Sequence, residues 1–355
     1  MLNMYLPGQN GGEAMFRLLF GQANPSGRLA ESWTISYQDV PFADEFGKER
    51  CDVYKESIFV GYRYYLTAGK QVRYPFGYGL SYTKFEYSNL NVTSQGEIYK
   101  VCCTVKNVGE RDGAEVVQLY VKAPNNKLFT PLRELRGFDK VYLKAGESAV
   151  VEIVVNTKDL CRWNIDSNSF VLESGRYDFE ICRDCQTVEL SYGVDITGEN
   201  FAVNTPTEIT EIYKTATIEK ITNEMFEQMS GVKITPIAPK RPITLESRFS
   251  DMKSTFMGKI LYNAVLSVAN NDMKKAKKLP EGVERDNKIK GAMMLWNILD
   301  SNSIISMSMC SGGHFSYNMA KGFADMANGK IFAGIAKMCK GIKAPALPKN
   351  KGDKQ

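Results

Sequence analysis

Histidine is almost absent from this sequence, which contains only His314, in a Ser-Gly-Gly-His stretch with no aspartate or second histidine beside it. One such residue cannot supply the oriented base of a Ser-His-Asp arrangement. Long apolar runs are also missing, since none approaches the ~20 residues that cross a bilayer. The first residues lack the basic, apolar and cleavage segments of a secretory signal. These absences predict no membrane partner and a cytoplasmic location.

Cysteine motifs are scarce as well, although the chain has eight cysteines. The only Cys-x-x-Cys motif is formed by Cys182 and Cys185. A structural zinc site usually needs four ligands, and no second pair has suitable spacing. Redox-active pairs open a helix, whereas this pair ends a predicted strand. We therefore predict reduced structural thiols, with no metal ion and no cofactor.

Charge of one sign is not in large excess. The net charge is +5 over 355 residues, and much of it comes from the tail after Lys337. This balance does not suggest a nucleic-acid partner, although the tail leaves binding to an acidic partner open. The glycine-containing loop at residues 7–13 has neither the P-loop ending nor the dinucleotide spacing, which argues against a phosphate site. Hydrophobic content of 43% is that of an ordinary globular protein, and the length suggests two or three domains.

The richest stretch is residues 54–87, where eleven of thirty-four residues are Phe or Tyr. Each aromatic side chain can bury ~150–250 Å², and the interleaved glycines let the backbone turn tightly. Exposing so much aromatic surface to water is unfavourable in free energy. We predict that it is a junction clamped between larger bodies.

The same stretch carries two long motifs, Tyr54-x-Glu56-x-Ile58-x-Val60-Gly61-Tyr62-Arg63-Tyr64-Tyr65 and Pro75-Phe76-Gly77-Tyr78-Gly79-Leu80-Ser81-Tyr82-Thr83. Together they resemble family 3 glycoside hydrolases of the β-glucosidase type. In that family this segment links an α/β sandwich domain to a fibronectin type III-like β-sandwich. The resemblance implies a multidomain protein with the same order of domains.

Residues 1–87 are predicted to hold only a remnant of the α/β sandwich domain and the aromatic connecting segment. Residues 1–6 resemble a buried strand, residues 14–21 an amphipathic helix ended by Gly21, and residues 24–29 the closing part of that domain. One strand and one helix cannot cover a core, because parallel strands need neighbours and helices on both faces. We therefore expect the chain to begin inside a domain and to be a fragment.

Residues 88–192 show the clearest two-residue period, for example in Tyr99, Val101, Cys103 and Val105. Several short alternating runs separated by turn residues predict an antiparallel β-sandwich. The motifs around Asn107, 113–121, 131–138 and 143–147 resemble the family's fibronectin type III-like domain. Trp163 is expected to be a core or corner aromatic.

The rest of the chain changes to helix-forming residues with many Met and Lys. We predict a linker and short helix over 193–242, a helical region over 243–342 and a basic tail over 343–355. Methionine stripes at helical spacing are expected to be core, with an adaptable binding groove as the alternative.

The resemblance implies a retaining glycosidase that hydrolyses terminal β-linked sugars of an oligosaccharide or glycoside. Retention uses two carboxyl groups ~5–5.5 Å apart. In the family the nucleophile is an Asp on a barrel, and the acid/base is a Glu upstream of the part that resembles residues 5–12. Neither has a match here, so no catalytic residue is assigned. The chain is expected to be inactive alone, with the barrel domain as a possible partner.

Two residues remain as substrate-proximal candidates, Glu56 and Arg63, and we expect Glu56 to pair with a cation such as Arg63, as a structural contact. The alternative function is a stand-alone, non-catalytic β-sandwich module that binds glycan or protein. A third possibility is a split enzyme in which a separate chain supplies the barrel.

Overall fold

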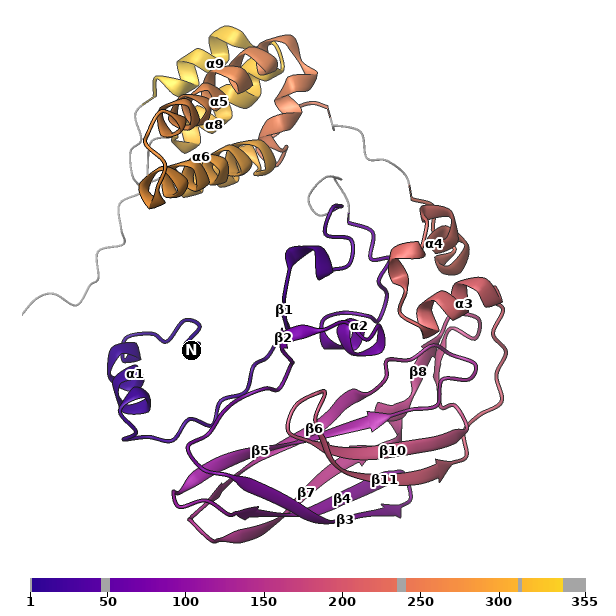
Figure 1. Cartoon of the computed structure of the whole chain (residues 1–355). Helices are drawn as coiled ribbons and strands as arrows, with labels where there is room; N and C mark the ends of the chain where they lie inside the picture. The colour runs from indigo at the N-terminus through magenta and orange to yellow at the C-terminus, as the bar shows by residue number, and fades with distance from the viewer. Residues whose placement is uncertain (1, 46–51, 235–240, 312–314, 341–355) are drawn as a thin grey trace, which may run out of the picture. The chain divides into compact units, whose positions relative to one another are not determined.

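The computed structural model describes residues 2–45, 52–234, 241–311 and 315–340. The chain divides into two compact units, Met1–Thr235 and Pro236–Gln355. The first unit is built on antiparallel sheets and the second is helical, as the sequence predicted (Figure 1).

A β-sandwich forms the body of the first unit. Its four-stranded sheet has the order β11-β10-β5-β6, and its three-stranded sheet has the order β3-β4-β7, with every pairing antiparallel (Figure 1). The seven strands are β3 (Phe85–Gln95), β4 (Ile98–Asn107), β5 (Gly113–Lys122), β6 (Glu134–Leu143), β7 (Ser148–Asn156), β10 (Gly175–Cys182) and β11 (Val188–Ile196). Successive side chains of a strand point to opposite faces of the sheet, and one face of each sheet is buried. Apolar residues therefore recur at every second position in the sequence.

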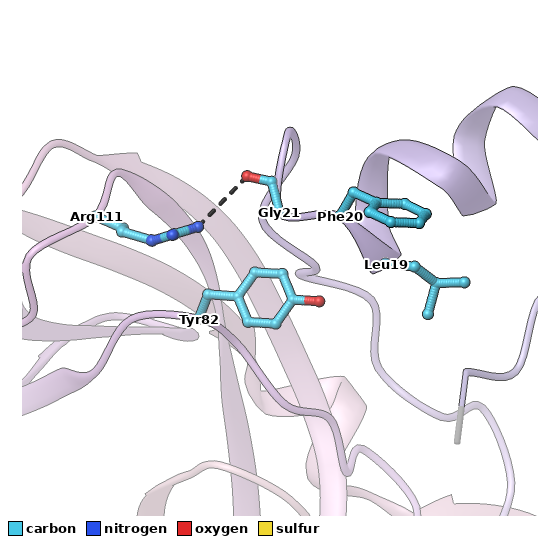
Figure 2. A pocket seen from close by; sticks show the side chains of 5 residues that line it. All are labelled: Leu19, Phe20, Gly21, Tyr82 and Arg111. Atoms are coloured by element: carbon cyan, nitrogen blue, oxygen red, sulfur yellow. Dashed lines mark hydrogen bonds between the residues drawn. The ribbon is translucent and has the colours of Figure 1, made fainter.

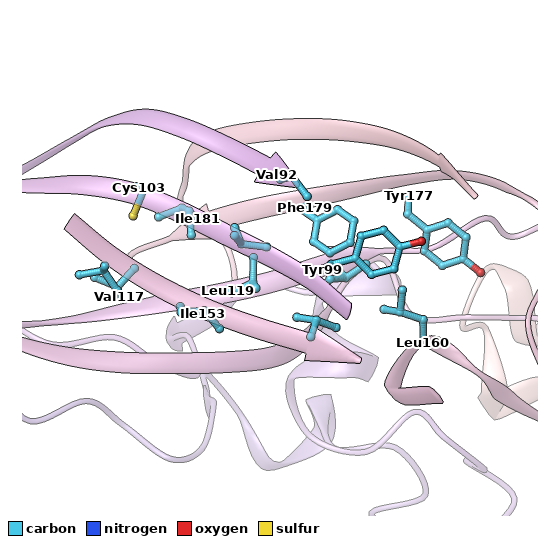
Figure 3. Close-up of a cluster of buried hydrophobic side chains, with 14 of the residues drawn as sticks. Val92, Tyr99, Cys103, Val117, Leu119, Ile153, Leu160, Tyr177, Phe179 and Ile181 are labelled. Atoms are coloured by element: carbon cyan, nitrogen blue, oxygen red, sulfur yellow. The ribbon is translucent and has the colours of Figure 1, made fainter. Parts of the chain in front are cut away.

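The sandwich core lies between the two sheets (Figure 3). Val101, Cys103 and Val105 of β4 face Val117 and Leu119 of β5 in one cluster, and all five side chains are buried. Removing apolar surface from water at roughly 25 cal/mol per Å² is the main force that holds such sheets together. The predicted alternation in these strands is confirmed.

The segment before the sandwich holds little regular structure. It contains α1 (Gly11–Leu19), the short strand pair β1 (Trp33–Thr34) and β2 (Val72–Tyr74), and α2 (Tyr62–Thr67). Gly21 has a φ of +70° after α1, as expected for a residue that ends a helix. The predicted strand at 1–6 was wrong for residues 2–6, because no strand in the described part of the chain lies beside them to pair with.

The aromatic segment is clamped, as its composition predicted. Tyr62 of α2 stacks on Phe76, with ring centroids 4.7 Å apart, and meets Tyr120 of the sandwich edge to face. On the other side, Tyr64 and Tyr65 belong to a buried cluster formed with a helical segment. That segment contains α3 (Thr207–Lys214), the 3-10 turn η3 (Ile218–Lys220) and α4 (Asn223–Ser230).

A small hairpin projects from the sandwich, formed by β8 (Arg162–Asn164) and β9 (Ser169–Val171). Trp163 lies on this hairpin with 49% of its surface exposed. Trp163 was expected to be a core or corner aromatic, and its exposure shows that the core alternative was wrong. A two-stranded hairpin has an outer face with nothing packed on it, so an alternating residue on that face reaches solvent.

The second unit is a helical domain. Its helices are α5 (Phe256–Lys277), α6 (Val283–Ser301), α7 (Ile304–Cys310), α8 (Tyr317–Ala327) and α9 (Ile331–Met338), preceded by the 3-10 turn η4 (Phe249–Ser254). Phe249, Met252, Tyr262 and Phe323 meet in its core. Of the methionines in the apolar stripes, Met252 is buried there as expected, whereas Met293 and Met294 are exposed; Met307, outside those stripes, is also buried. The Ser316 side chain accepts a hydrogen bond from the Met319 amide and caps α8.

Several sequence expectations fall outside the described residues, namely those on His314, the basic tail 343–355 and most of the proline-rich stretch 236–242. None of the helices in the described ranges combines the length and the apolar character that a membrane crossing requires.

Candidate functional site

Glu56 and Arg63 lie on either side of Phe59 in the aromatic segment, but the structure does not pair them. Arg63 donates from Nε to Oε1 of Glu134 at 2.8 Å instead. The expected ion pair between Glu56 and Arg63 was therefore wrong. A second arginine, Arg136, contacts the other oxygen of Glu134 at 2.6 Å.

Glu56 is half-buried beside the end of α3. Its carboxylate adds to the effect of burial in raising the pKa of Tyr213, whose side chain is completely buried. Burial is the larger cause, because the phenolate would lose its hydration. Glu56 therefore lies against an aromatic cluster, and its proximity to a substrate stays a prediction.

Arg28 and Glu115 form the most enclosed ion pair of the segment that precedes the sandwich. Arg28 Nη2 lies 2.6 Å from Oε2 of Glu115, and their side chains are 11% and 4% exposed. The other oxygen of Glu115 accepts a hydrogen bond of 2.6 Å from the hydroxyl of Tyr87. Burial, and then the charge of Glu115, raises the pKa of Tyr87, so this hydroxyl stays protonated and keeps donating.

The other buried carboxylates of the sandwich also have structural partners. Glu173 meets Arg162 at 2.9 Å, and Glu180 meets Arg133 at 2.7 Å. Burial raises the pKa of Glu180, with Arg133 acting in the opposite direction. Asp184 accepts hydrogen bonds from the amides that follow it in the turn before β11. A retaining glycosidase needs one carboxylate free to attack and one that exchanges a proton. These buried carboxylates are committed to ion pairs and turns.

The Cys182–Cys185 pair is buried under the aromatic segment. Both are free thiols, and they cluster with Tyr62 and Tyr120. Burial raises the pKa of Cys185 to about 12 and raises that of Cys182 in the same direction. A reactive cysteine needs a depressed pKa and access to solvent. The pair therefore acts as packing, in agreement with the sequence-based interpretation. Among the residues with described positions, no group of three or more metal-ligating side chains occurs.

A shallow hollow of about 420 Å³ lies where α1 meets the start of the sandwich (Figure 2). Leu19, Phe20, Gly21, Tyr82 and Arg111 line it. The Arg111 guanidinium lies 5.9 Å from the centre of the Tyr82 ring and donates to the carbonyl of Gly21 at 3.4 Å. No carboxylate lines this hollow, so it offers contact surface and no acid–base chemistry.

Sequence reasoning missed three residues that organise this region: Glu134, Glu115 and Tyr213. Glu134 and Glu115 lie in motifs that were noted for their resemblance, and for Glu115 an acidic residue in a mostly apolar strand was the available signal. No such signal exists for Tyr213, because its hydrogen-bond partner lies 158 residues earlier.

Two family models match this chain. The model described as "Glycosyl hydrolase family 3 C-terminal domain" matches residues 1–82, and the model described as "Fibronectin type III-like domain" matches residues 115–185. The two matches lie on either side of the junction between the aromatic segment and the sandwich.

Curated relatives match over about half of the chain. "Thermostable beta-glucosidase B" of Acetivibrio thermocellus is 39% identical over 218 residues, which are 59% of this chain and 29% of that protein. "Exo-alpha-(1->6)-L-arabinopyranosidase" of Bifidobacterium breve is 39% identical over 201 residues, or 56% of this chain and 27% of that protein. The chain thus spans less than a third of these relatives' length.

Solved structures give the same picture. β-Glucosidase 3B of Thermotoga neapolitana, in complex with α-D-glucose, superposes with a TM-score of 0.51 at 38% identity, over 54% of this chain and 28% of that one. A family 3 β-glucosidase of Bifidobacterium adolescentis gives a TM-score of 0.54 at 34% identity, over 61% of this chain and 33% of that one.

Proposed function

We propose that this chain is the C-terminal portion of a retaining, β-glucosidase-type glycoside hydrolase, because residues 1–82 match the glycosyl hydrolase family 3 C-terminal domain and residues 115–185 match the fibronectin type III-like domain. The observation that carries the proposal is that the two family models match in this order along the chain, together with 39% identity to a β-glucosidase over 218 residues and structural likeness to another over 54% of the chain. Its substrate is a β-linked oligosaccharide or glycoside, which the complete enzyme hydrolyses.

The proposal leaves catalysis to another part of the enzyme. The buried carboxylates of the sandwich are held by arginines or by a turn, so they do not supply a nucleophile and a proton donor. Glu56 and Arg63 are proposed to lie near the substrate, with Arg63 held by Glu134. The chain alone is expected to be inactive.

An uncovered apolar surface on α1 supports a partner domain. Phe16, Leu19 and Phe20 are 47%, 59% and 70% exposed, and Met15 is 43% exposed. A helix whose large apolar side chains face water is unfavourable unless another surface covers them. We propose that the barrel and the remainder of the α/β domain, in the same polypeptide or in a separate one, provide that cover. We also propose a cytoplasmic location, supported by the free cysteines of the described residues.

The test uses p-nitrophenyl β-D-glucoside. Residues 1–355 alone should release no nitrophenol above buffer, and co-expression with the barrel and upstream α/β segment of a family 3 β-glucosidase should produce turnover. Phe20→Asp should abolish complementation, whereas Phe138→Asp, an equally exposed aromatic on β6, should not. Turnover by the chain alone that disappears in Glu56→Gln would contradict the proposal.

The alternative, a stand-alone module that binds glycan or protein, is favoured by exposed aromatics on the sandwich, among them Phe138, Trp163 and Phe170. It predicts binding without any complementation of hydrolysis. Failure of the co-expression experiment would favour it.

A further inference from the structure

Basic residues are concentrated in the second unit. Residues 236–355 contain 20 Lys and Arg but only nine Asp and Glu, whereas residues 1–235 contain 25 and 31. The two parts of the chain therefore carry net charges of +11 and −6. The imbalance is sharpest around α9, since the sequence from Met326 to Gly352 contains no acidic residue. Such an asymmetry favours an anionic partner for the basic part of the chain.

Helix α9 is fixed in the second unit through its inner face. A Cβ at Gly334 would lie 2.6 Å from the carbonyl oxygen of Gly322, so the backbones of α9 and α8 are in close contact. The side chain of Lys337 forms an ion pair with Asp325 of α8. Met338 packs against the apolar core of the unit. One face of α9 is therefore committed to the domain, and this fixes which side chains face outward.

The opposite face of α9 is apolar and exposed. Phe332 is 89% exposed and Ile335 is 46% exposed, although both are large apolar side chains. Ala336 and Cys339, one turn further along, are exposed as well. The spacing i, i+3, i+4 and i+7 puts these four side chains on one side of a helix. No part of the chain that the structure describes covers this face.

Lysines lie at both ends of the apolar face. Lys330 precedes the first turn of α9 and Lys340 follows its last turn, and both are exposed. Among the described residues, neither lysine has a carboxylate within ion-pair distance. The side chain of Asn318 donates to the Lys340 carbonyl at 3.1 Å, which places the start of α8 at this end. There the ammonium group of Lys321 lies over the half-exposed ring of Tyr317, 4.4 Å from its centre.

This combination of groups distinguishes between the possible anionic partners. A phosphodiester backbone or an acidic peptide would use the lysines but would leave Phe332 and Ile335 in water. A stable protein interface takes roughly 20–30 residues from each side, whereas α9 has eight residues. The surface of an anionic bilayer suits both kinds of side chain, because its acyl boundary receives apolar groups and its headgroups attract lysines. An outward-facing helix enters that surface without needing a complementary groove.

We propose that the outer face of α9 binds the surface of a bilayer that contains anionic phospholipids. Phe332 and Ile335 enter the boundary between headgroups and acyl chains, and Lys330 and Lys340 contact the phosphates. The expectation of no membrane partner came from the lack of a spanning segment, which a surface contact does not require. The proposal is independent of the proposed function, because α9 lies outside both family matches.

The test sediments residues 1–355 with vesicles of phosphatidylcholine, with or without phosphatidylglycerol as about one third of the lipid. The protein should bind the anionic vesicles much more tightly than the neutral ones, and molar salt should weaken binding, because it screens exposed charges. Phe332→Asp should weaken binding by about tenfold or more, because it replaces an apolar group by a charge that the headgroups repel. Lys330→Gln and Lys340→Gln should each weaken binding by about fivefold.

Phe256→Asp is the matched control. Phe256 of α5 is 80% exposed, so this variant removes an accessible ring from the same unit and makes the same change of charge. It should bind vesicles as the unaltered chain does. Circular dichroism and thermal unfolding should be unchanged in the Asp and Gln variants, because the altered side chains are exposed. Phe332→Trp, in a chain whose three tryptophans are replaced by Phe, should shift its fluorescence to shorter wavelength with anionic vesicles.

Other occupants of the α9 face predict different results. Self-association in sedimentation velocity that Phe332→Asp abolishes would identify a second copy of the chain, and binding of a DNA duplex that requires Phe332 would identify a nucleic acid. Either result would overturn the proposal, as would equal binding to neutral and anionic vesicles, no binding to either, or equal effects of Phe332→Asp and Phe256→Asp. None of these measurements involves hydrolysis, so their failure is distinct from failure of the complementation experiment.

Discussion

The hydroxyl of Tyr213 donates a hydrogen bond of 2.6 Å to the backbone carbonyl of Lys55. This bond joins helix α3 to the start of the aromatic segment across 158 residues of sequence. The Tyr213 ring also stacks on Phe129, with centroids 4.6 Å apart, and lies in the cluster that buries Tyr64 and Tyr65. The helices after the sandwich are therefore part of the junction and complete its core.

The first prediction follows from this contact. Tyr213→Phe should destabilise the first unit by about 1–3 kcal/mol, because the carbonyl of Lys55 is left buried without its donor. Tyr37→Phe is the matched control, since the hydroxyl of Tyr37 donates to the Ala43 carbonyl at the surface. It should change the free energy by less than about 0.5 kcal/mol. Urea unfolding followed by tryptophan fluorescence measures both, and equal effects would show that the Lys55 contact is not structural.

The second prediction concerns the buried pair Arg28–Glu115, which ties the segment before the aromatic junction to the sandwich. Glu115→Gln should cost about 3 kcal/mol or more, because the guanidinium of Arg28 is left without its counter-charge in a site that excludes water. Glu13→Gln breaks the pair with Arg17, whose side chains are 63% and 59% exposed, and should cost less than about 1 kcal/mol.

Thermal unfolding at low salt compares these two variants. The double variant Arg28→Met with Glu115→Leu should recover much of the loss, since an apolar pair of similar volume leaves no unpaired charge. A loss in Glu115→Gln no larger than in Glu13→Gln would mean that water reaches the pair.

Much of the sandwich could be predicted from sequence, because its pattern is local. Val101, Cys103 and Val105 alternate with polar residues, and that alternation follows directly from the pleat of a strand with one buried face. The aromatic motif was likewise sufficient to predict a clamped junction. In both cases the signal and its cause lie within a few neighbouring residues.

The errors all concern contacts between distant residues. Arg63 was expected to pair with Glu56, seven residues away, but its partner Glu134 is 71 residues away. The core alternative for Trp163 was also wrong, because an exposed tryptophan and a core tryptophan look the same in sequence. Residues 2–6 have the composition of a strand, but a strand forms only beside another strand. Ion-pair partners, burial and strand formation at these positions depend on which distant residues the fold places next to them.

The third prediction tests the Cys182–Cys185 pair. At pH 8 neither thiol should react with iodoacetamide in the folded protein, because both have raised pKa values and lie in the core. Cys339, which is exposed, should be modified under the same conditions. Peptide mass spectrometry before and after adding urea gives the answer, and native labelling of either residue of the pair would contradict a structural role.

The raised pKa values of the same thiols also predict how the free energy of unfolding changes with pH. Burial raises the pKa of Cys185 in the fold to about 12, from the ordinary value of 9.0. Above about pH 9 the unfolded chain therefore releases this proton while the folded chain keeps it. The contribution of Cys185 to stability is complete below pH 9 and decreases as the pH rises toward 12. Cys185→Ser should reduce this alkaline decline in chemical unfolding, as should Cys182→Ser.

The fourth prediction compares two glycines inside helices of the second unit. A Cβ at Gly322 of α8 would lie 2.6 Å from the carbonyl oxygen of Gly334 in α9, which is backbone and cannot move aside easily. Gly322→Ala should therefore destabilise the unit by about 1–3 kcal/mol through overpacking. Gly291 of α6 has open space at the same position, so Gly291→Ala should stabilise it by about 0.5–1 kcal/mol through helix propensity.

These opposite signs make the comparison informative, since the chemical change is identical. Chemical unfolding followed by the fluorescence of Trp296, on α6, reports on this unit; Trp33→Phe and Trp163→Phe in the background remove the tryptophans of the first unit. If Gly322→Ala also stabilised the protein, α8 and α9 would not approach as closely as the backbone places them. If Gly291→Ala destabilised the second unit, another surface would have to lie against α6 at Gly291. The exposed residues Met293 and Met294 of α6 would then be candidates for the same interface.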